Sequence, residues 1–185
     1  MIKEFLKSYR DKYLFGIRTR VYNLIDKNSR VVDLGCGDGE LLRILSQKIK
    51  YGFGFDKDFS KIELAKKLTE KSKIENLEFK IADAKYNLNE KFGYSILMFV
   101  LHSLDYDCQK KILNNARKNS DKLIVVDYDA LIKPRLLVQA DEILAGHYRN
   151  FKDYFKREGI ENLIKKDSFE KFDTGKNHLK IWKIK

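Results

Sequence analysis

The sequence has 185 residues, of which 43% are hydrophobic and 12% aromatic. It carries 38 Lys and Arg residues against 27 Asp and Glu residues, a formal net charge of +11. This length and composition exclude a disordered, fibrous or low-complexity chain and predict one globular domain with a sizeable core.

In chain order, the apolar spacing and turn signals predict alternating helices and strands. Ser60 and Glu63 have the spacing of a capping box, which predicts a helix start there. The expected elements are a helix over 2–27, a strand over 30–34, a helix over 39–48, a strand over 51–56, a helix over 60–71, strands over 77–82 and 95–100, a helix over 107–119, a strand over 122–126 and two or three helices over 135–166.

The alternation predicts a mainly parallel sheet with helices on both faces, in which ligands bind at the carboxyl ends of the strands. Residues 168–184 contain two further strand-like runs around a turn at 173–177. The second run alternates apolar and polar side chains, as expected for an antiparallel strand with one buried face.

The two cysteines, Cys36 and Cys108, are too few for a disulfide framework or a four-ligand zinc site, so we predict no metal site and a reducing compartment. The first residues are charged throughout, and the most apolar stretch, 94–104, is far shorter than a membrane span of about 20 residues. We therefore expect a cytoplasmic protein without a membrane segment.

The positive charge is concentrated at the two ends of the chain. Residues 1–30 contain eight basic and three acidic residues, and residues 131–185 contain 13 and eight. The segment 31–130 is nearly balanced, with 17 basic and 16 acidic residues. Basic ends of this kind are either ordinary solvated surface or an attraction for phosphate backbones.

A glycine loop joins the first predicted strand to the helix that follows it. Gly35, Gly37 and Gly39 lack a Cβ atom, which permits a tight turn and the close approach of a ligand. The loop departs from the Gly-x-Gly-x-x-Gly pattern of dinucleotide sites because its third glycine comes one residue early. No Gly-Lys-Ser/Thr follows it, so a P-loop is excluded.

Carboxylates surround the loop, namely Asp33, Asp38 and Glu40. Neighbouring like charges repel by roughly 1–4 kcal/mol, so this turn is a poor site for a pyrophosphate and a good one for a cation such as an ammonium or sulfonium group. Asp56 ends the second strand at the spacing typical of an acid that binds ribose hydroxyls, and Asp83 follows the third strand. Together these acids predict a site for an adenosine that carries a cationic amino-acid tail.

Residues 31–39, Val-Val-Asp-Leu-Gly-Cys-Gly-Asp-Gly, resemble the first motif of class I S-adenosylmethionine-dependent methyltransferases. Phe55–Asp56 resembles the acid that follows this motif in the family, and Ala82–Ala84 resembles its adenine-contacting segment. The resemblance covers about 25–130 in order and spacing.

The resemblance implies a Rossmann-like α/β fold with a seven-stranded, mainly parallel sheet and a C-terminal antiparallel hairpin. It also implies S-adenosyl-L-methionine as the cofactor. On this basis we expect a single methyltransferase domain over 1–185, made of an N-terminal helical cap (1–29), a cofactor-binding core (30–130), a helical insertion (131–167) and the C-terminal hairpin (168–185).

In the family the glycine loop wraps the methionine part of the cofactor, the acid at Asp56 binds both ribose hydroxyls, and the position of Asp83 faces the adenine amine. Lys57 departs from the family, which often has a small or apolar residue there. The expected cofactor contacts are Asp33, Gly35, Cys36, Gly37, Gly39, Asp56, Lys57, Asp83, Ala84 and Phe99. Cys36 is assigned no redox role.

Candidates for the acceptor side follow the fourth and fifth strands. His102 has a suitable unperturbed pKa for a general base, but a lone histidine there is more often a packing residue. Tyr128 and His147 are further weak candidates, and no catalytic residue is assigned. Methyl transfer from a sulfonium needs a base only when the acceptor must lose a proton.

Two helical segments have both a packing and a functional interpretation. Tyr148, Phe151 and Tyr154 share one helical face, which favours packing on the sheet over a substrate wall. The N-terminal helix either folds over the cofactor, through Tyr9, Tyr13 or Tyr22, or is a solvated helix that packs in part.

Several functions are compatible with these features. We expect a methyltransferase that acts on a small molecule, because no recognition module is apparent. The alternatives are an RNA or protein methyltransferase, which the basic ends would suit, and a non-catalytic module that binds S-adenosylmethionine. A nicotinamide enzyme is disfavoured by the carboxylates of the glycine loop.

Overall fold

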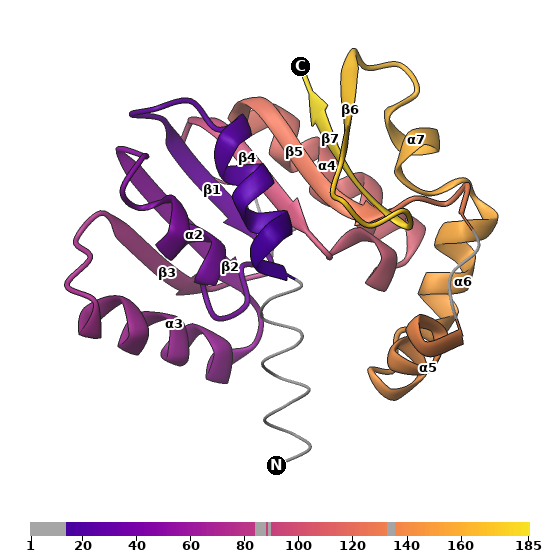
Figure 1. Cartoon of the computed structure of the whole chain (residues 1–185), viewed down its shortest axis with the longest axis horizontal. Helices are drawn as coiled ribbons and strands as arrows, with labels where there is room; N and C mark the ends of the chain where they lie inside the picture. Colours follow the sequence, from indigo (N-terminus) through magenta and orange to yellow (C-terminus); the bar gives the residue numbers. More distant parts are fainter. Residues whose placement is uncertain (1–13, 84–87, 89, 133–135) are drawn as a thin grey trace.

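The computed structural model describes residues 14–83, 88, 90–132 and 136–185. Seven strands form one sheet in the order β3-β2-β1-β4-β5-β7-β6, as Figure 1 shows. The strands are β1 (Arg30–Leu34), β2 (Tyr51–Asp56), β3 (Leu77–Ile81), β4 (Phe92–Met98), β5 (Ser120–Tyr128), β6 (Phe169–Asp173) and β7 (Leu179–Ile184). The predicted seven-stranded Rossmann-like fold is confirmed.

Strands β1 to β5 pair in parallel, whereas β7 is antiparallel to both β5 and β6. The strand order reverses at β1, which lies between β2 and β4. Ligands of such sheets bind outside the carboxyl ends of the strands at this reversal. The predicted C-terminal antiparallel hairpin is present and lies next to β5.

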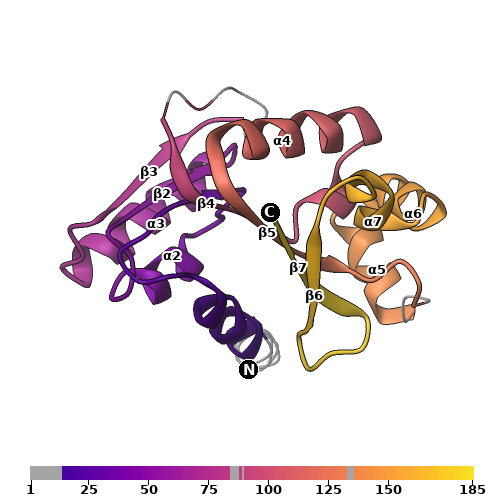
Figure 2. The ribbon, with the colours of Figure 1, turned by 90° about the horizontal axis from the view of Figure 1, so that it is seen from above.

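Helices cover both faces of the sheet. They are α2 (Glu40–Leu45), α3 (Phe59–Lys71), α4 (Tyr106–Asn119), α5 (Leu136–Leu144), α6 (Tyr148–Lys156) and α7 (Gly159–Ile164), with a 3-10 turn η1 (Leu101–Ser103) and an N-terminal helix described over 14–24. Figure 2 shows α4 on one side of the sheet and the N-terminal helix on the other.

The core has two layers because successive strand side chains point to opposite faces. In β5, Ile124 and Val126 pack with the N-terminal helix, α2 and α3, whereas Leu123 and Val125 pack with α4, α6 and α7. The continuous apolar run predicted for a strand buried on both faces is also present in β4, where Ile96 and Leu97 belong to different layers.

Several predicted boundaries are wrong: α2 ends at Leu45 rather than at residue 48, β4 begins at Phe92 rather than at residue 95, and β5 covers Ser120–Tyr128 rather than 122–126. The cap of α3 is Asp58, whose side chain accepts hydrogen bonds from the amides of Ser60 and Lys61, so Ser60 lies inside the first turn. Strand β4 ends at Met98 rather than at residue 100, because Phe99 has a left-handed backbone with φ of 59°. The N-terminal helix ends at residue 24 rather than 27, and residues 1–13 lie outside the described part of the chain.

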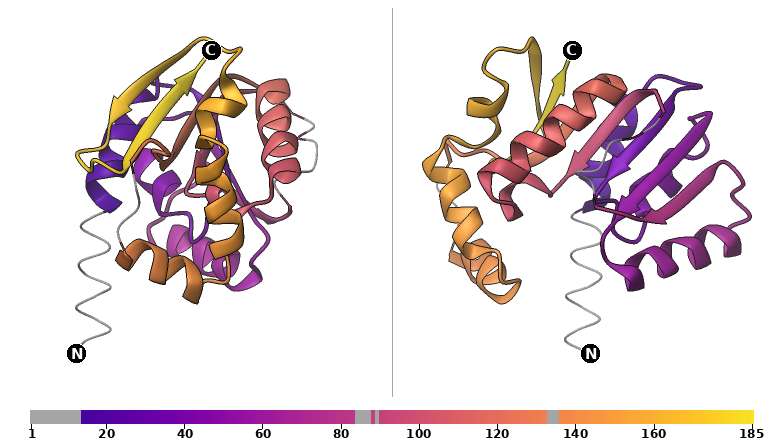
Figure 3. Two further views of the ribbon diagram at one scale, coloured as in Figure 1. Left: turned by 90° about the vertical axis from the view of Figure 1, so that its right-hand side faces the viewer. Right: turned by 180° about the vertical axis from the view of Figure 1, so that it is seen from behind.

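Helices α5 and α6 lie at the end of the molecule toward which the parallel strands point (Figures 1 and 3). The N-terminal helix and the glycine loop after β1 reach the same end. This carboxyl edge is therefore where the candidate site must be sought.

Candidate functional site

The glycine loop adopts a backbone that only glycine takes easily. Gly35, Gly37 and Gly39 have φ values of 85°, 57° and 72°, in the left-handed region. A Cβ atom at Gly39 would lie 2.5 Å from the ring of Phe79, so this glycine serves packing. A Cβ atom at Gly37 would meet no described protein atom within 4 Å, so the space beside Gly37 is open to a ligand.

Asp56 is oriented by the loop it faces. Its Oδ2 accepts a hydrogen bond of 2.9 Å from the amide of Gly37, and its Oδ1 accepts one of 3.0 Å from the amide of Asp58. Each carboxylate oxygen can accept more than one hydrogen bond, so both oxygens keep capacity for ligand hydroxyls. The spacing that predicted a ribose-binding acid thus corresponds to a fixed carboxylate at the end of β2.

Asp33 is a buried acid with an unsatisfied oxygen. Its side chain is 2% exposed, and its Oδ1 has no hydrogen-bond partner among the described residues. Burial and the neighbouring charge of Asp56 raise the pKa of Asp33 to about 7, against the lowering effect of Arg18. A buried carboxylate without a partner is costly, so this geometry is suited to a ligand that brings a positive charge.

A cavity of about 150 Å³ lies over these groups. The N-terminal helix supplies Arg18, whose guanidinium is 2.7 Å from Oε2 of Glu40 and whose side chain is 11% exposed. The cavity is lined by Leu14, Arg18, Asp33, Gly35, Cys36, Gly37, Asp38, Glu40, Leu41, Met98 and Phe99. Its lining thus combines acidic groups, one partly buried cation, and apolar side chains from the N-terminal helix, from α2 and from the end of β4.

Several predicted cofactor residues lie together in this cavity, namely Asp33, Gly35, Cys36, Gly37 and Phe99. Gly39 and Asp56 adjoin it through the loop, and Asp83 follows β3 on the same edge of the sheet. Lys57 is exposed and does not line it, and Ala84 lies outside the described residues.

The N-terminal helix covers the cavity, but through residues that the sequence did not single out. Leu14 and Arg18 line it, whereas Tyr22 packs on the core with Lys48 Nζ 4.6 Å from its ring centre. Tyr9 and Tyr13 lie outside the described residues. No sequence motif surrounds Arg18, so only the packing of the helix on the sheet shows that Arg18 lines the cavity.

Cys36 is buried in the glycine loop. Burial and the nearby carboxylates of Asp33 and Asp56 raise the pKa of its thiol, so the thiol stays neutral and unreactive. This supports the interpretation of Cys36 as a small residue that fits the loop.

His102, in η1, lies between two acids, Asp127 of β5 and Glu142 of α5. Its Nδ1 is 2.6 Å from Oδ1 of Asp127, and its Nε2 is 3.3 Å from Oε1 of Glu142. Burial alone would lower the pKa of His102, but the two carboxylates outweigh burial and raise the pKa to about 10. An imidazole that is already protonated at neutral pH cannot accept a proton, which argues against a general-base role.

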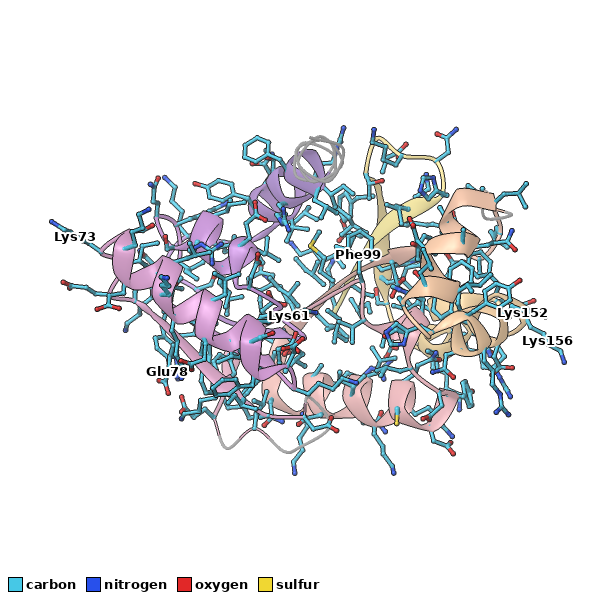
Figure 4. All side chains as sticks on the ribbon, turned by 90° about the horizontal axis from the view of Figure 1, so that it is seen from below. Lys61, Lys73, Glu78, Phe99, Lys152 and Lys156 are labelled. Carbon is cyan, nitrogen blue, oxygen red and sulfur yellow. The ribbon has the colours of Figure 1, made fainter. Side chains whose placement is uncertain are left out.

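Tyr128 ends β5 at the centre of an aromatic group. Its ring centre is 4.8 Å from that of His102, 5.2 Å from that of Phe151 and 6.5 Å from that of Phe99. Figure 4 looks onto this edge and shows Phe99 between the start of α3, marked by Lys61, and α6. Tyr128 and Phe99 therefore connect the cavity with the insertion.

The aromatic face predicted for residues 148–154 packs on the sheet. Phe151 and Tyr154 are each 1% exposed, and the hydroxyl of Tyr154 donates to the carbonyl of Tyr128 at 3.0 Å. His147 precedes α6 and does not line the cavity. These contacts favour the packing interpretation over the substrate wall.

Two kinds of feature are absent from the described residues. No group of three or more His, Cys, Asp or Glu side chains among them could hold a metal ion. In the same part of the chain, no helix has the length and apolar character to cross a membrane.

Comparison with known proteins identifies the family. Residues 25–159 match the family model described as "Methyltransferase domain". The chain is 29% identical over 106 residues to protein 235L of Invertebrate iridescent virus 6, whose name assigns it provisionally to the methyltransferases. That match covers 55% of this chain but only 38% of the viral protein.

Solved structures share the fold. The PH0226 protein of Pyrococcus horikoshii OT3 superposes with a TM-score of 0.70 and 18% identity, covering 95% of this chain and 90% of that chain. A SAM-dependent methyltransferase of Aquifex aeolicus has a TM-score of 0.68 and 12% identity, covering 90% and 88%.

The chain belongs to the methyltransferase domain family. Its strand order and glycine loop are those of a class I S-adenosylmethionine-dependent methyltransferase domain with S-adenosylmethionine as cofactor, as the sequence resemblance predicted.

Proposed function

We propose that the protein transfers the methyl group of S-adenosylmethionine to a small-molecule acceptor. The observation that carries this proposal is the buried Oδ1 of Asp33, which has no hydrogen-bond partner among the described residues. Asp33 and Arg18 line the same cavity. A negative and a positive side chain in one small cavity complement the ammonium and carboxylate groups of an amino-acid tail.

The described residues fit the rest of the cofactor. Asp33 would hold the ammonium group and Arg18 the carboxylate, while Asp56 would bind the ribose hydroxyls beside Gly37. Asp83, after β3, would face the adenine amine, as the family resemblance implies. When bound, the cofactor supplies a methyl group that is already activated by a positive sulfur.

The acceptor would lie on the β4–β5 side of the cavity. Met98 and Phe99, at the end of β4, line the cavity, and the ring of Tyr128 lies next to that of Phe99 on the side of the insertion. These residues would orient the acceptor and exclude water, and alignment of this kind is worth about 7–11 kcal/mol in favourable cases. Because His102 is protonated, an acceptor whose nucleophile needs no base suits this site best.

An RNA acceptor is the second candidate, and one observation favours it. The described part of the N-terminal basic end lies beside the C-terminal hairpin, because Lys183 Nζ donates to the carbonyl of Leu24 at 3.2 Å and Arg20 adjoins Gly175. A protein acceptor and a binding module without catalysis remain alternatives that the experiment below separates. Unpartnered Asp33 disfavours a pyrophosphate ligand such as a nicotinamide dinucleotide.

The test combines binding and transfer. Titration calorimetry should show that S-adenosylmethionine and S-adenosylhomocysteine bind and that NAD does not. Binding of NAD without binding of the other two compounds contradicts the proposal. Labelled cofactor is then incubated with cell extract divided into small-molecule, RNA and protein fractions. Label in the small-molecule fraction supports the proposal, label in RNA or protein supports the alternatives, and binding without transfer to any fraction supports the binding module.

A further inference from the structure

Helix α5 is attached to the domain in an unusual way. Among its side chains that the structure describes, Glu142 alone is buried, at 7% exposure. Leu136, Ile143 and Leu144 are 83%, 58% and 85% exposed. Leucines are normally buried and acids exposed, so α5 presents the reverse of the usual arrangement. Polar side-chain contacts link this helix to the rest of the domain: Oε1 of Gln139 accepts a hydrogen bond from the hydroxyl of Tyr148 at 3.4 Å, and Glu142 lies next to His102 and Tyr128.

The contact of Glu142 leads through His102 to the centre of the sheet. Oε1 of Glu142 is 3.3 Å from Nε2 of His102, and Nδ1 of His102 is 2.6 Å from Oδ1 of Asp127. Asp127 is fully buried and its Oδ2 accepts hydrogen bonds from the amides of Leu101 and His102. Because each ring nitrogen lies within ion-pair distance of a carboxylate oxygen, the two acids together favour the imidazolium form of the ring.

The contact also reaches the proposed acceptor side. The hydroxyl of Tyr128 lies 3.4 Å from the same oxygen of Glu142, and the ring of Tyr128 stands nearly perpendicular to that of His102 at 4.8 Å. Tyr128 and Phe99 are 6.5 Å apart, and Phe99 lines the cofactor cavity. Any displacement of Glu142 thus alters the surroundings of the tyrosine next to that cavity.

We propose that His102 is a positioning residue, which bridges Asp127 and Glu142 and so holds α5 against Tyr128 as one wall of the acceptor site. The inference rests on the proposed function for the location of the acceptor. It assigns His102 no contact with the reacting atoms. The bridge through His102 accounts for the position of α5 at the carboxyl edge of the sheet, although Leu136, Ile143 and Leu144 of α5 are exposed.

Hydrogen exchange measures the docking of α5 directly. In the full chain saturated with S-adenosylhomocysteine, we expect Glu142→Ala to exchange the amides of α5 at least tenfold faster than the unmodified protein, with Glu142→Gln between the two. Asp141→Ala is the matched control, because Asp141 is the exposed acid next to Glu142 on the same helix. Equal exchange in the unmodified protein and Glu142→Ala overturns the inference.

The pH profile separates this role from ordinary helix stabilisation. The groups that face His102 are Asp127 and Tyr128 from β5 and Glu142 from α5, and His147 acts on Glu142. The pKa of His102 is raised to about 10, so the bridge is present below that pH and is lost above it. Protection of α5 relative to α4 should fall as the pH passes about 10, and Glu142→Ala should abolish this change. A pH-independent ratio contradicts the inference.

Two further measurements keep the inference distinct from the proposed function. The affinity for S-adenosylhomocysteine, measured by calorimetry, should stay within twofold in Glu142→Ala, whereas methyl transfer to the small-molecule fraction falls at least tenfold. Asp141→Ala should change neither. If the unmodified protein does not bind the cofactor, the proposed function is contradicted. If Glu142→Ala transfers methyl groups as fast as the unmodified protein, only the role of His102 is contradicted.

Discussion

The amide of Gly37 donates a hydrogen bond of 2.9 Å to Oδ2 of Asp56, which ties the middle of the glycine loop to the end of β2. The acid and the glycine are 19 residues apart in the chain, yet Gly37 lines the cavity and this bond holds Asp56 next to it. Substitutions at these two positions therefore test separately the glycine loop and the end of β2 as parts of the expected cofactor site.

At Gly37 the expected effect is a loss of affinity that exceeds the loss of stability. A Cβ atom there meets no described protein atom, so Gly37→Ala should cost about 1–2 kcal/mol through the left-handed backbone alone. Gly146→Ala is the matched control, because Gly146 has φ of 77° and an equally open Cβ position outside the cavity. Calorimetry with S-adenosylhomocysteine should show weaker binding for Gly37→Ala only. Equal affinities of the two variants contradict the assignment.

At Asp56 the change to alanine removes the carboxylate expected to bind the ribose. Hydrogen bonds to a charged group are worth about 1.5–3 kcal/mol each, so two of them predict at least a hundredfold weaker binding of S-adenosylhomocysteine. Asp58→Ala is the control, since it removes the cap of α3 and should lower the free energy of unfolding by about 0.5–2 kcal/mol. Unchanged affinity in Asp56→Ala, or an equal loss in both, rejects the ribose role.

The raised pKa of Asp33 predicts two effects of pH. Without ligand, the free energy of unfolding should fall as pH rises from about 4 to 7, because the unfolded chain loses this proton first. Asp33→Asn should lack this contribution, as chemical denaturation at pH 5 and 8 will show. An ammonium ligand requires the ionised acid, so binding of S-adenosylhomocysteine below pH 7 should release a proton. Calorimetry in buffers of different ionisation enthalpy measures this release, and its absence contradicts the role of Asp33.

Arg18 is expected to bind the cofactor carboxylate. Arg18→Gln should weaken S-adenosylhomocysteine binding by tenfold or more, as loss of a charge-assisted hydrogen bond predicts. Arg20→Gln removes the same charge from the same helix beside the hairpin, away from the cavity, and should leave the affinity unchanged. If the two variants bind equally well, the cavity does not use Arg18.

The RNA alternative predicts a steep response to salt. Contacts with phosphates release counterions, so RNA affinity should fall by orders of magnitude between about 50 and 200 mM salt. Filter binding or fluorescence anisotropy with a generic single-stranded RNA measures this dependence. A flat response, or no binding at the lower salt concentration, removes RNA as the acceptor.

Local spacing was sufficient to predict the order of the strands along the chain, the glycine loop and the position of Asp56 at the end of β2, because these features depend on neighbours in the chain. It failed at β4, where the left-handed backbone of Phe99 ends the strand inside an apolar run. It also missed Arg18, which reaches the cavity through helix packing, and Glu142, which meets His102 across 40 residues of sequence. Such pairs depend on tertiary distance and leave no periodic signal.

The reversal of strand order at β1 has an evolutionary consequence. Most residues that would hold the donor come from the chain up to Asp83, whereas Tyr128, His102 and the insertion with α5 lie on the other half of the sheet. The two halves can therefore diverge separately. Grafting the insertion, residues 131–167, from another member of this family would be a direct way to exchange acceptor preference while the donor half is retained.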